Sequence, residues 1–156
     1  MTIQAIETSY RGRYFRSRLE ARWAVFLDVL NIEWVHEPDS YSTRAGWYLP
    51  DFQIVNGRDY IFIEIKPYYP NSTEQAKCFG LAEHFNSKYI FFCCGLPGAE
   101  NILCVDAAPE QDAYILSHQH DKYAFWRWFM FEIYDRDCQD TEIIMAHHKA
   151  ATFNFD

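Results

Sequence analysis

Tyr48-Leu49-Pro50-Asp51-Phe52, followed after a short interval by Ile61-Phe62-Ile63-Glu64-Ile65-Lys66, decides the fold of this chain. These runs contain many β-branched and aromatic residues, which favour strands. Between them lies Asn56-Gly57, the strongest short-range signal for a two-residue hairpin turn. The sequence therefore predicts two antiparallel strands joined by a tight turn.

The predicted register gathers charged side chains on one face of this hairpin. If Val55 pairs with Arg58 across the turn, Asp51 lies opposite Phe62. Side chains alternate faces along a strand, and directly opposed residues share a face. One face then carries Asp51, Phe62, Glu64 and Lys66, and the other carries Ile61, Ile63 and Ile65.

Two carboxylates at this spacing can hold a hard divalent cation such as Mg²⁺ or Mn²⁺. We expect Asp51 and Glu64 to be its ligands, with the backbone carbonyl of Ile65 as a third. Lys66, on the same face, can orient an attacking water or stabilise charge that develops on a phosphate. The alternative is a cross-strand ion pair on a solvated face, which contributes ~0.2–1 kcal/mol.

A helix is predicted from Ser17 to about Asn31, because its apolar residues recur at steps of three and four. Glu20 lies at the border of this apolar stripe. Ser17 and Glu20 match the S-x-x-E capping box, in which both side chains bond to free amides of the first turn. The other interpretation directs Glu20 toward the sheet, as an acid in the outer shell that holds the waters of the metal or a second ion. One side chain cannot do both in one rotamer.

Basic residues precede and begin this helix. Arginine side chains and the amides of a helix start both attract phosphate. We therefore predict nucleic-acid contacts from Arg11, Arg13, Arg16 and Arg18. A solvated lead-in without a ligand is the alternative.

Composition bounds the remaining choices. A chain of 156 residues that is 49% hydrophobic suits one folded domain. It has no apolar run long enough to span a bilayer and no secretory signal pattern, so we expect a cytoplasmic protein. The formal net charge is -8, but residues 1–70 carry 8 Lys and Arg against 9 Asp and Glu. The acidity therefore lies mostly in the later part, which suits a protein partner.

Cysteine and histidine spacings do not indicate a transition-metal site. The 5 cysteines form no C-x-x-C pair, so buried free thiols are expected. The pairs His118/His120 and His147/His148 lack the i, i+4 spacing of a helical metal site with a third ligand.

The remaining segments complete an α/β pattern in which helices cover a mixed sheet. Residues 1–15 are expected to be an extended or loosely helical lead-in. A helix capped by Ser72 or Thr73 should run to about Asn86. Residues 123–134 are dense in aromatics and predict a helix that is either buried or an interface. Strands are expected at Ile32–Glu37, Lys88–Cys94 and Asn101–Val105.

Three blocks of the chain resemble the PD-(D/E)XK nuclease superfamily, including Holliday junction resolvases and the end-cleaving endonucleases of transposition systems. The blocks are Phe15-Arg16-Ser17-Arg18-Leu19-Glu20-Ala21-Arg22-Trp23, Tyr48-Leu49-Pro50-Asp51-Phe52 and Glu64-Ile65-Lys66-Pro67. The resemblance implies a restriction-endonuclease-like core in the order α-β-β-β-α-β, with dependence on Mg²⁺ or Mn²⁺. It implies Asp51 and Glu64 as metal ligands, Lys66 as the catalytic lysine and Glu20 as the helix acid. Tyr48 and Gln75 are candidates for accessory roles.

The expected domain has a nuclease-like core at residues 1–106 and a C-terminal aromatic-rich elaboration at 107–156. The expected function is endonucleolytic hydrolysis of branched or duplex DNA, in a bacterium or a phage-infected host. A ribonuclease is one alternative, because no feature of the sequence reads the 2′-hydroxyl. A non-catalytic inhibitor or assembly factor on the same fold is another. A homodimer through the aromatic segment is also expected, since cutting both strands commonly needs two sites.

Overall fold

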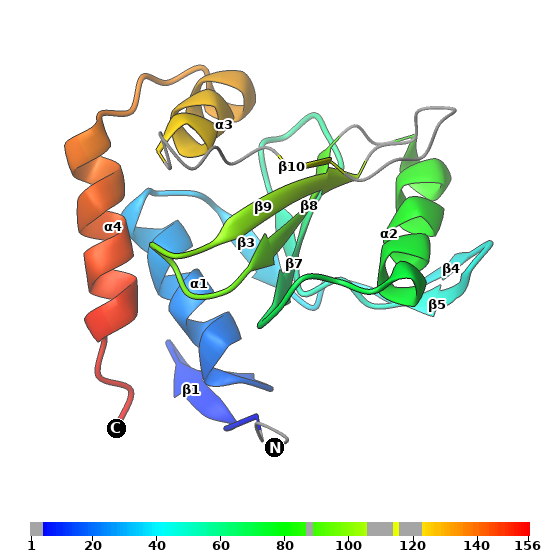
Figure 1. Cartoon of the computed structure of the whole chain (residues 1–156), viewed down its shortest axis with the longest axis horizontal. Coiled ribbons are helices and arrows are strands. Elements are labelled where there is room, and N and C mark those ends of the chain that lie inside the picture. Colours follow the sequence, from blue (N-terminus) through cyan, green and yellow to red (C-terminus); the bar gives the residue numbers. More distant parts are fainter. Residues whose placement is uncertain (1–4, 87–88, 106–113, 116–122) are drawn as a thin grey trace.

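A six-stranded sheet lies at the centre of the molecule (Figure 1), with the order β10-β9-β8-β7-β6-β3. The computed structural model describes residues 5–86, 89–105, 114–115 and 123–156. Strand β7 pairs with β8 in parallel, and the other neighbours pair antiparallel, so the sheet is mixed as predicted. The strands are β3 (Trp34–His36), β6 (Phe52–Ile54), β7 (Ile61–Lys66), β8 (Tyr89–Cys94), β9 (Asn101–Val105) and β10 (Tyr114–Ile115).

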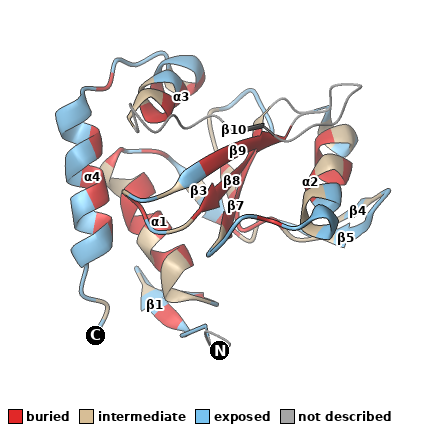
Figure 2. Cartoon of the chain, viewed as in Figure 1, coloured by how far each residue is buried: buried red, intermediate tan, exposed pale blue. Residues whose placement is uncertain are grey.

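Helices cover both faces of this sheet and create two hydrophobic clusters. One face packs against helices α1 (Arg18–Val29) and α3 (Ala124–Tyr134), with α4 (Asp140–Thr152) packed against α1, and the other face packs against α2 (Ser72–Phe85). Figure 2 shows the central strands buried and the outer sides of the helices exposed. The alternation predicted for β7 is confirmed, because Ile61, Ile63 and Ile65 pack toward α1 while Phe62 packs toward α2.

The predicted two-residue turn at Asn56-Gly57 is wrong. Strand β6 ends at Ile54 and β7 begins at Ile61, so residues 55–60 form a longer loop. The Asn56 side chain accepts hydrogen bonds from the amides of Arg58 and Asp59, which uses it inside this loop rather than in a tight hairpin. Ile54 pairs with Ile61, a register two residues away from the predicted one. An even shift keeps every side chain on its predicted face.

Helix boundaries lie close to the predicted ones, and the caps explain where they begin. Ser17 caps α1 by accepting a hydrogen bond from the Glu20 amide. For α2 the cap is Asn71 rather than Ser72 or Thr73, and it forms a reciprocal capping box with Glu74. Strand β7 ends before Pro67, as expected of a residue that cannot donate to the sheet.

Three structured segments differ from the expectation. The lead-in contains a hairpin of β1 (Thr8–Tyr10) and β2 (Arg13–Phe15), whose turn places Arg11 and Gly12 at positive φ, as a two-residue turn of type I′ requires. The polar stretch before Pro50 contains a second hairpin, of β4 (Tyr41–Thr43) and β5 (Gly46–Tyr48). Helix α4 was not expected, because its exposed face is polar and its apolar stripe is narrow.

The aromatic segment forms α3, and most of its rings enter the core. Trp126 and Phe129 are fully buried, while Trp128 and Phe131 keep 40% and 59% of their surface exposed. The predicted division at residues 106 and 107 falls outside the described residues, as do His118 and His120. No helix in the described ranges is long and apolar enough to cross a membrane. All of the cysteines are buried free thiols, as expected.

Candidate metal centre

Asp51, directly before β6, and Glu64, inside β7, lie next to each other. Asp51 is 3% exposed and Glu64 is 8% exposed. The Asp51 amide donates to Glu64 Oε2 at 3.1 Å, and the Ile65 amide donates to Asp51 Oδ2 at 2.8 Å. Each carboxylate is thus tied to the backbone of the other strand. The structure brings together the two acids that the sequence selected.

The surroundings of these two carboxyl groups disfavour their negatively charged forms. Burial raises the pKa of Asp51 well above its ordinary value, and the charges of Glu64 and Glu20 raise it further. The amide of Ile65 and the guanidinium of Arg16 oppose this shift. The pKa of Glu64 is also raised by burial, although Tyr48, Lys66 and the Asp51 amide counteract it. Clustered carboxylates with raised pKa values are typical of functional sites.

Lys66 lies on the face shared with Glu64, but its amine contacts an acid from α2. The distance from Lys66 Nζ to Glu74 Oε2 is 2.6 Å. Burial alone would lower the pKa of Lys66, but the hydrogen bond to Glu74 and the charges of Glu64, Glu74 and Asp51 give a net increase. Lys66 is therefore protonated near neutral pH, as a fixed positive charge beside the carboxylate pair.

The two accessory candidates have different surroundings. The Tyr48 hydroxyl lies 3.3 Å from the Cys78 Sγ and is a hydrogen-bond partner of Glu64, so it supports the carboxylate. Burial raises the pKa of Tyr48, and Cys78 and Glu64 add to the increase, so the hydroxyl is a donor. The Gln75 amide instead donates to the Pro70 carbonyl at 2.9 Å, which uses it at the start of α2.

Of the arginines predicted to bind nucleic acid, Arg16 is the one whose contacts include the carboxylate pair. Its guanidinium lies 3.4 Å from Asp51 Oδ1 and 2.8 Å from Glu37 Oε1. Arg11 pairs with Asp28, Arg18 pairs with Asp156, and Arg13 lies over the Trp34 ring. The side chains of Arg11, Arg16 and Arg18 are at least one-third exposed, and Arg13 is an exposed residue, so all four are accessible to a ligand. Their contacts with phosphate stay a prediction.

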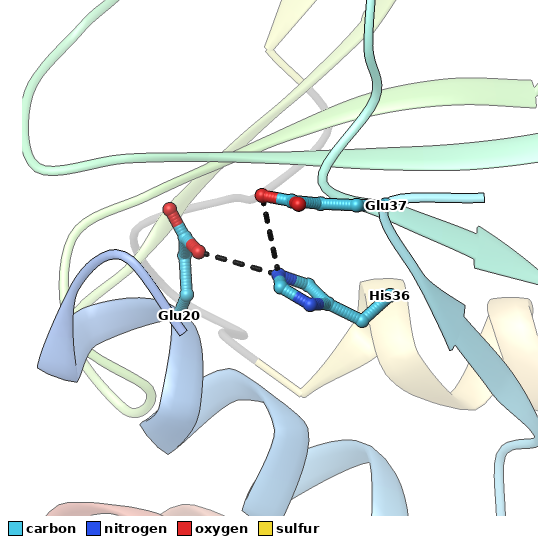
Figure 3. Close-up of side chains that lie close together, drawn as sticks. All are labelled: Glu20, His36 and Glu37. Atoms are coloured by element: carbon cyan, nitrogen blue, oxygen red, sulfur yellow. Dashed lines mark ion pairs between the residues drawn. The ribbon is translucent and has the colours of Figure 1, made fainter. Parts of the chain in front are cut away.

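Glu20 does not complete the capping box with Ser17. Its carboxylate turns instead toward His36, at the end of β3, with 3.5 Å between Glu20 Oε2 and His36 Nε2. Glu37 Oε1 lies 3.8 Å from the same nitrogen. Figure 3 shows the three side chains converging, Glu20 from α1, His36 from the end of β3 and Glu37 from the position directly after that strand. Glu20 also acts electrostatically on Asp51 and Glu64.

Sequence reasoning missed His36, Glu37 and Glu74. The signal for the first two was the His36-Glu37-Pro38 run at a strand end facing a helix acid. For Glu74 it was the position three residues after Asn71, which is that of a capping-box acid. In each case the partner is distant in sequence, so periodicity within one element does not reveal it.

Comparisons of the chain with family models, with curated proteins and with solved structures gave no match. What the residues can do chemically therefore rests on their geometry.

Proposed function

We propose that this chain is a metal-dependent nuclease that hydrolyses phosphodiester bonds in DNA, with Asp51 and Glu64 as the ligands of Mg²⁺ or Mn²⁺. One observation carries the proposal: two carboxylates are buried side by side, with a third, Glu20, close enough to raise the pKa of both. Burying mutually repelling acids is unfavourable unless a cation compensates them. The arrangement is therefore best explained as a cation site.

The order of the elements supports the same proposal. With the β4–β5 hairpin set aside as an insertion between β3 and β6, the elements α1, β3, β6, β7, α2 and β8 run along the chain as helix, three strands, helix and strand. This is the order implied by the resemblance to PD-(D/E)XK nucleases, and we propose that these elements form a restriction-endonuclease-like core. Glu20 lies in the helix of this series, Asp51 before its second strand, and Glu64 and Lys66 in its third.

The donor set fits a hard divalent cation. One oxygen of each carboxylate accepts a hydrogen bond from a backbone amide, which fixes the side chain and leaves lone pairs on the other oxygen. The Ile65 carbonyl remains the proposed third ligand. When bound, such an ion polarises the scissile phosphate and lowers the pKa of a bound water. Mg²⁺ keeps several waters, so one or two carboxylates suffice.

The basic side chains would act on the phosphate. Because its pKa is raised, Lys66 stays protonated and would stabilise negative charge in the transition state rather than remove a proton. To do so, the Lys66 amine must leave its contact with the Glu74 carboxylate and contact the phosphate instead. Arg16, whose side chain is 62% exposed, can likewise exchange a carboxylate for a phosphate oxygen.

The test is turnover by the purified protein with Mg²⁺ or Mn²⁺ on branched, single-stranded and duplex DNA, and on RNA. We expect metal-dependent cleavage of at least one DNA, reduced by a factor of about 10³ or more in Asp51→Asn and about 10² or more in Lys66→Met. Asp137→Asn is the matched control, since Asp137 is exposed.

Three outcomes would count against the proposal. Cleavage that Asp51→Asn leaves unchanged would point to a contaminating enzyme. Cleavage of RNA alone would replace the substrate. Absence of cleavage, together with indifference to Mn²⁺ in calorimetry and co-purification of a protein, would favour a non-catalytic interaction protein.

A further inference from the structure

We propose that Glu20, His36 and Glu37 form a second cation site, distinct from the Asp51–Glu64 pair, which takes a divalent transition-metal ion of the Mn²⁺ or Zn²⁺ type. Each residue offers one ligand atom, and the three atoms lie within 4.8 Å of one another. Figure 3 shows both carboxylates directed at the same imidazole nitrogen. The existence of this site does not depend on the proposed function, but any part in hydrolysis does.

The polar atoms of this cluster lack the partners that burial demands. The His36 side chain is 6% exposed and that of Glu20 is 11% exposed. Neither His36 Nε2 nor Glu20 Oε2 has a hydrogen-bond partner among the described residues. Buried polar groups are nearly always hydrogen-bonded, and leaving one unsatisfied destabilises the folded protein. A ligand between them would satisfy both atoms at once.

The imidazole is held in place by aromatic rings. The His36 ring centroid lies 4.3 Å from that of Phe15 and 5.5 Å from that of Phe52, which is also its partner across β3 and β6. On the other side, Ser17 fixes the first turn of α1 from which Glu20 projects. The ligand atoms of Glu20 and His36 therefore come from a helix and a strand, which is the arrangement that precise metal sites use.

The spacing and the donor types indicate the class of ion. Around a tetrahedral Zn²⁺ with bonds of about 2.0–2.2 Å, neighbouring ligand atoms lie about 3.4 Å apart. The observed distances from His36 Nε2 are 3.5 Å to Glu20 and 3.8 Å to Glu37. Imidazole nitrogen favours Mn²⁺, Fe²⁺ or Zn²⁺ over Mg²⁺, which prefers oxygen ligands and retains its waters. We therefore expect selectivity for transition-metal ions at this site.

Arg16 connects the two proposed sites. Its Nε lies 2.8 Å from Glu37 Oε1, and another guanidinium nitrogen lies 3.4 Å from Asp51 Oδ1. Glu37 also donates its backbone amide to the Asp51 carbonyl at 2.8 Å. An ion at the second site would take over the Glu37 oxygen that Arg16 now contacts. Filling this site should therefore free the guanidinium for an anion.

The experiment uses Mn²⁺ as the probe and pulsed electron paramagnetic resonance as the readout, because an imidazole ligand imposes a ¹⁴N modulation on the Mn²⁺ signal. We expect two bound Mn²⁺ ions in the full chain, with a ¹⁴N modulation that disappears when histidine is labelled with ¹⁵N. His36→Gln should lose one ion and the modulation, and Asp51→Asn should lose one ion and keep the modulation. His148→Gln is the matched control, since His148 is exposed.

Absence of a nitrogen modulation from the unaltered chain would overturn the proposal, whether or not His36→Gln folds. It would mean that the cluster is only a buried contact of His36 with the two acids. Persistence of the modulation in folded His36→Gln would also overturn it. The two proposals fail separately: modulation without cleavage of any nucleic acid would leave this site standing, and cleavage without modulation would leave only the first.

Discussion

Asp51 is a residue whose charge the metal-free fold does not need. Its carboxylate is buried beside Glu64, and the backbone amide of Ile65 and the partly exposed Arg16 compensate it only in part. A neutral amide of the same shape avoids the repulsion and can still accept the bond from Ile65. Asp51→Asn should therefore raise the free energy of unfolding of the metal-free protein by about 1–2 kcal/mol while removing the ion proposed at the Asp51–Glu64 pair. Urea denaturation with a chelator present measures this change.

The control for this prediction is Asp137→Asn, which should change the unfolding free energy by less than about 0.5 kcal/mol. A destabilised Asp51→Asn protein would mean that the carboxylate is needed for folding itself, and not held there for a ligand.

The same residue predicts the sign of a pH effect. Because the folded pKa of Asp51 lies above its ordinary value of 3.8, the folded state holds a proton that the unfolded state has lost. Stability of the metal-free protein then falls as pH rises from about 4 through the raised pKa. The stability advantage of Asp51→Asn should grow over this range and vanish at lower pH. Denaturation of both proteins across the range, without metal, measures it. A pH-independent difference would contradict the assigned shift.

At the scale of elements, α2 packs so closely on the β4–β5 hairpin that Gly80 cannot gain a side chain. A Cβ on Gly80 would lie 2.8 Å from Thr43 Oγ1 and 3.3 Å from Ala45 Cβ. Thr43 Oγ1 is held by bonds to the Gly46 carbonyl and the Ala45 amide, so it cannot easily turn away. Gly80→Ala, which stabilises an isolated helix by about 1 kcal/mol, should here destabilise the protein by about 1–2 kcal/mol.

Thermal unfolding of Gly80→Ala, Thr43→Ala and the double variant forms the check. The double variant should recover part of the loss, because Thr43→Ala removes the nearest atom. If the changes in stability caused by Gly80→Ala and Thr43→Ala simply add in the double variant, the hairpin already moves away from the new Cβ without the loss of Thr43. Strand β5 carries Tyr48, so a displaced hairpin should also weaken the support of Glu64.

The elements that sequence predicted well are those whose pattern is local. Strands β7 and β8 are short apolar runs bounded by prolines or glycine, and α1 has a clear apolar stripe, so each was found near its observed bounds. The hairpin was predicted with the wrong turn because the Asn56 side chain bonds within the loop rather than at a tight corner. The β1–β2 and β4–β5 hairpins have strands of three residues each, too short for alternation to be recognised.

The same distinction applies to the site. Asp51, Glu64 and Lys66 were selected because strand periodicity places them on one face, and that placement survives the change of register. His36 and Glu74 were missed because their partners, Glu20 and Lys66, lie on other elements. Whether Glu20 caps α1 or faces the site was undecidable from spacing, since both uses suit the same position.

At the scale of the whole molecule, the buried carboxylate of Glu100 links the turn after β8 to helices α3 and α4. Glu100 follows the turn after β8 and accepts bonds from Gly98, from Trp126 of α3 and from His147 of α4. Burial would raise the pKa of Glu100, but the bonds and the charge of His147 lower it. Glu100→Ala leaves buried donors without an acceptor and should destabilise the protein by about 3–5 kcal/mol.

Urea denaturation compares this variant with Glu132→Ala, an exposed acid on α3 whose loss should cost less than about 1 kcal/mol. Equal effects of the two substitutions would show that α3 and α4 are held by their apolar contacts alone.

The predicted assemblies also belong to this scale. Most rings of α3 fill the core, which leaves Trp128 and Phe131 as its exposed aromatic side chains for a contact with a second copy. The homodimer and the protein partner for the acidic later part stay predictions. Exposed acids for such a partner are present at Asp135, Asp137, Asp140 and Glu142.

The loop at residues 55–60 has a consequence for how this sequence can diverge. Two hydrogen bonds set the register of β6 on β7, one from the Asp51 amide to the Glu64 carboxylate and one from the Ile65 amide to the Asp51 carboxylate. Apolar packing on both faces of the sheet adds to them, and the loop does not determine the register. Descendants can therefore gain or lose residues there without parting the two acids. A single insertion inside β6 would instead turn Asp51 into the apolar layer. Among descendants of this sequence, insertions and deletions should therefore occur at residues 55–60 and be absent from β6.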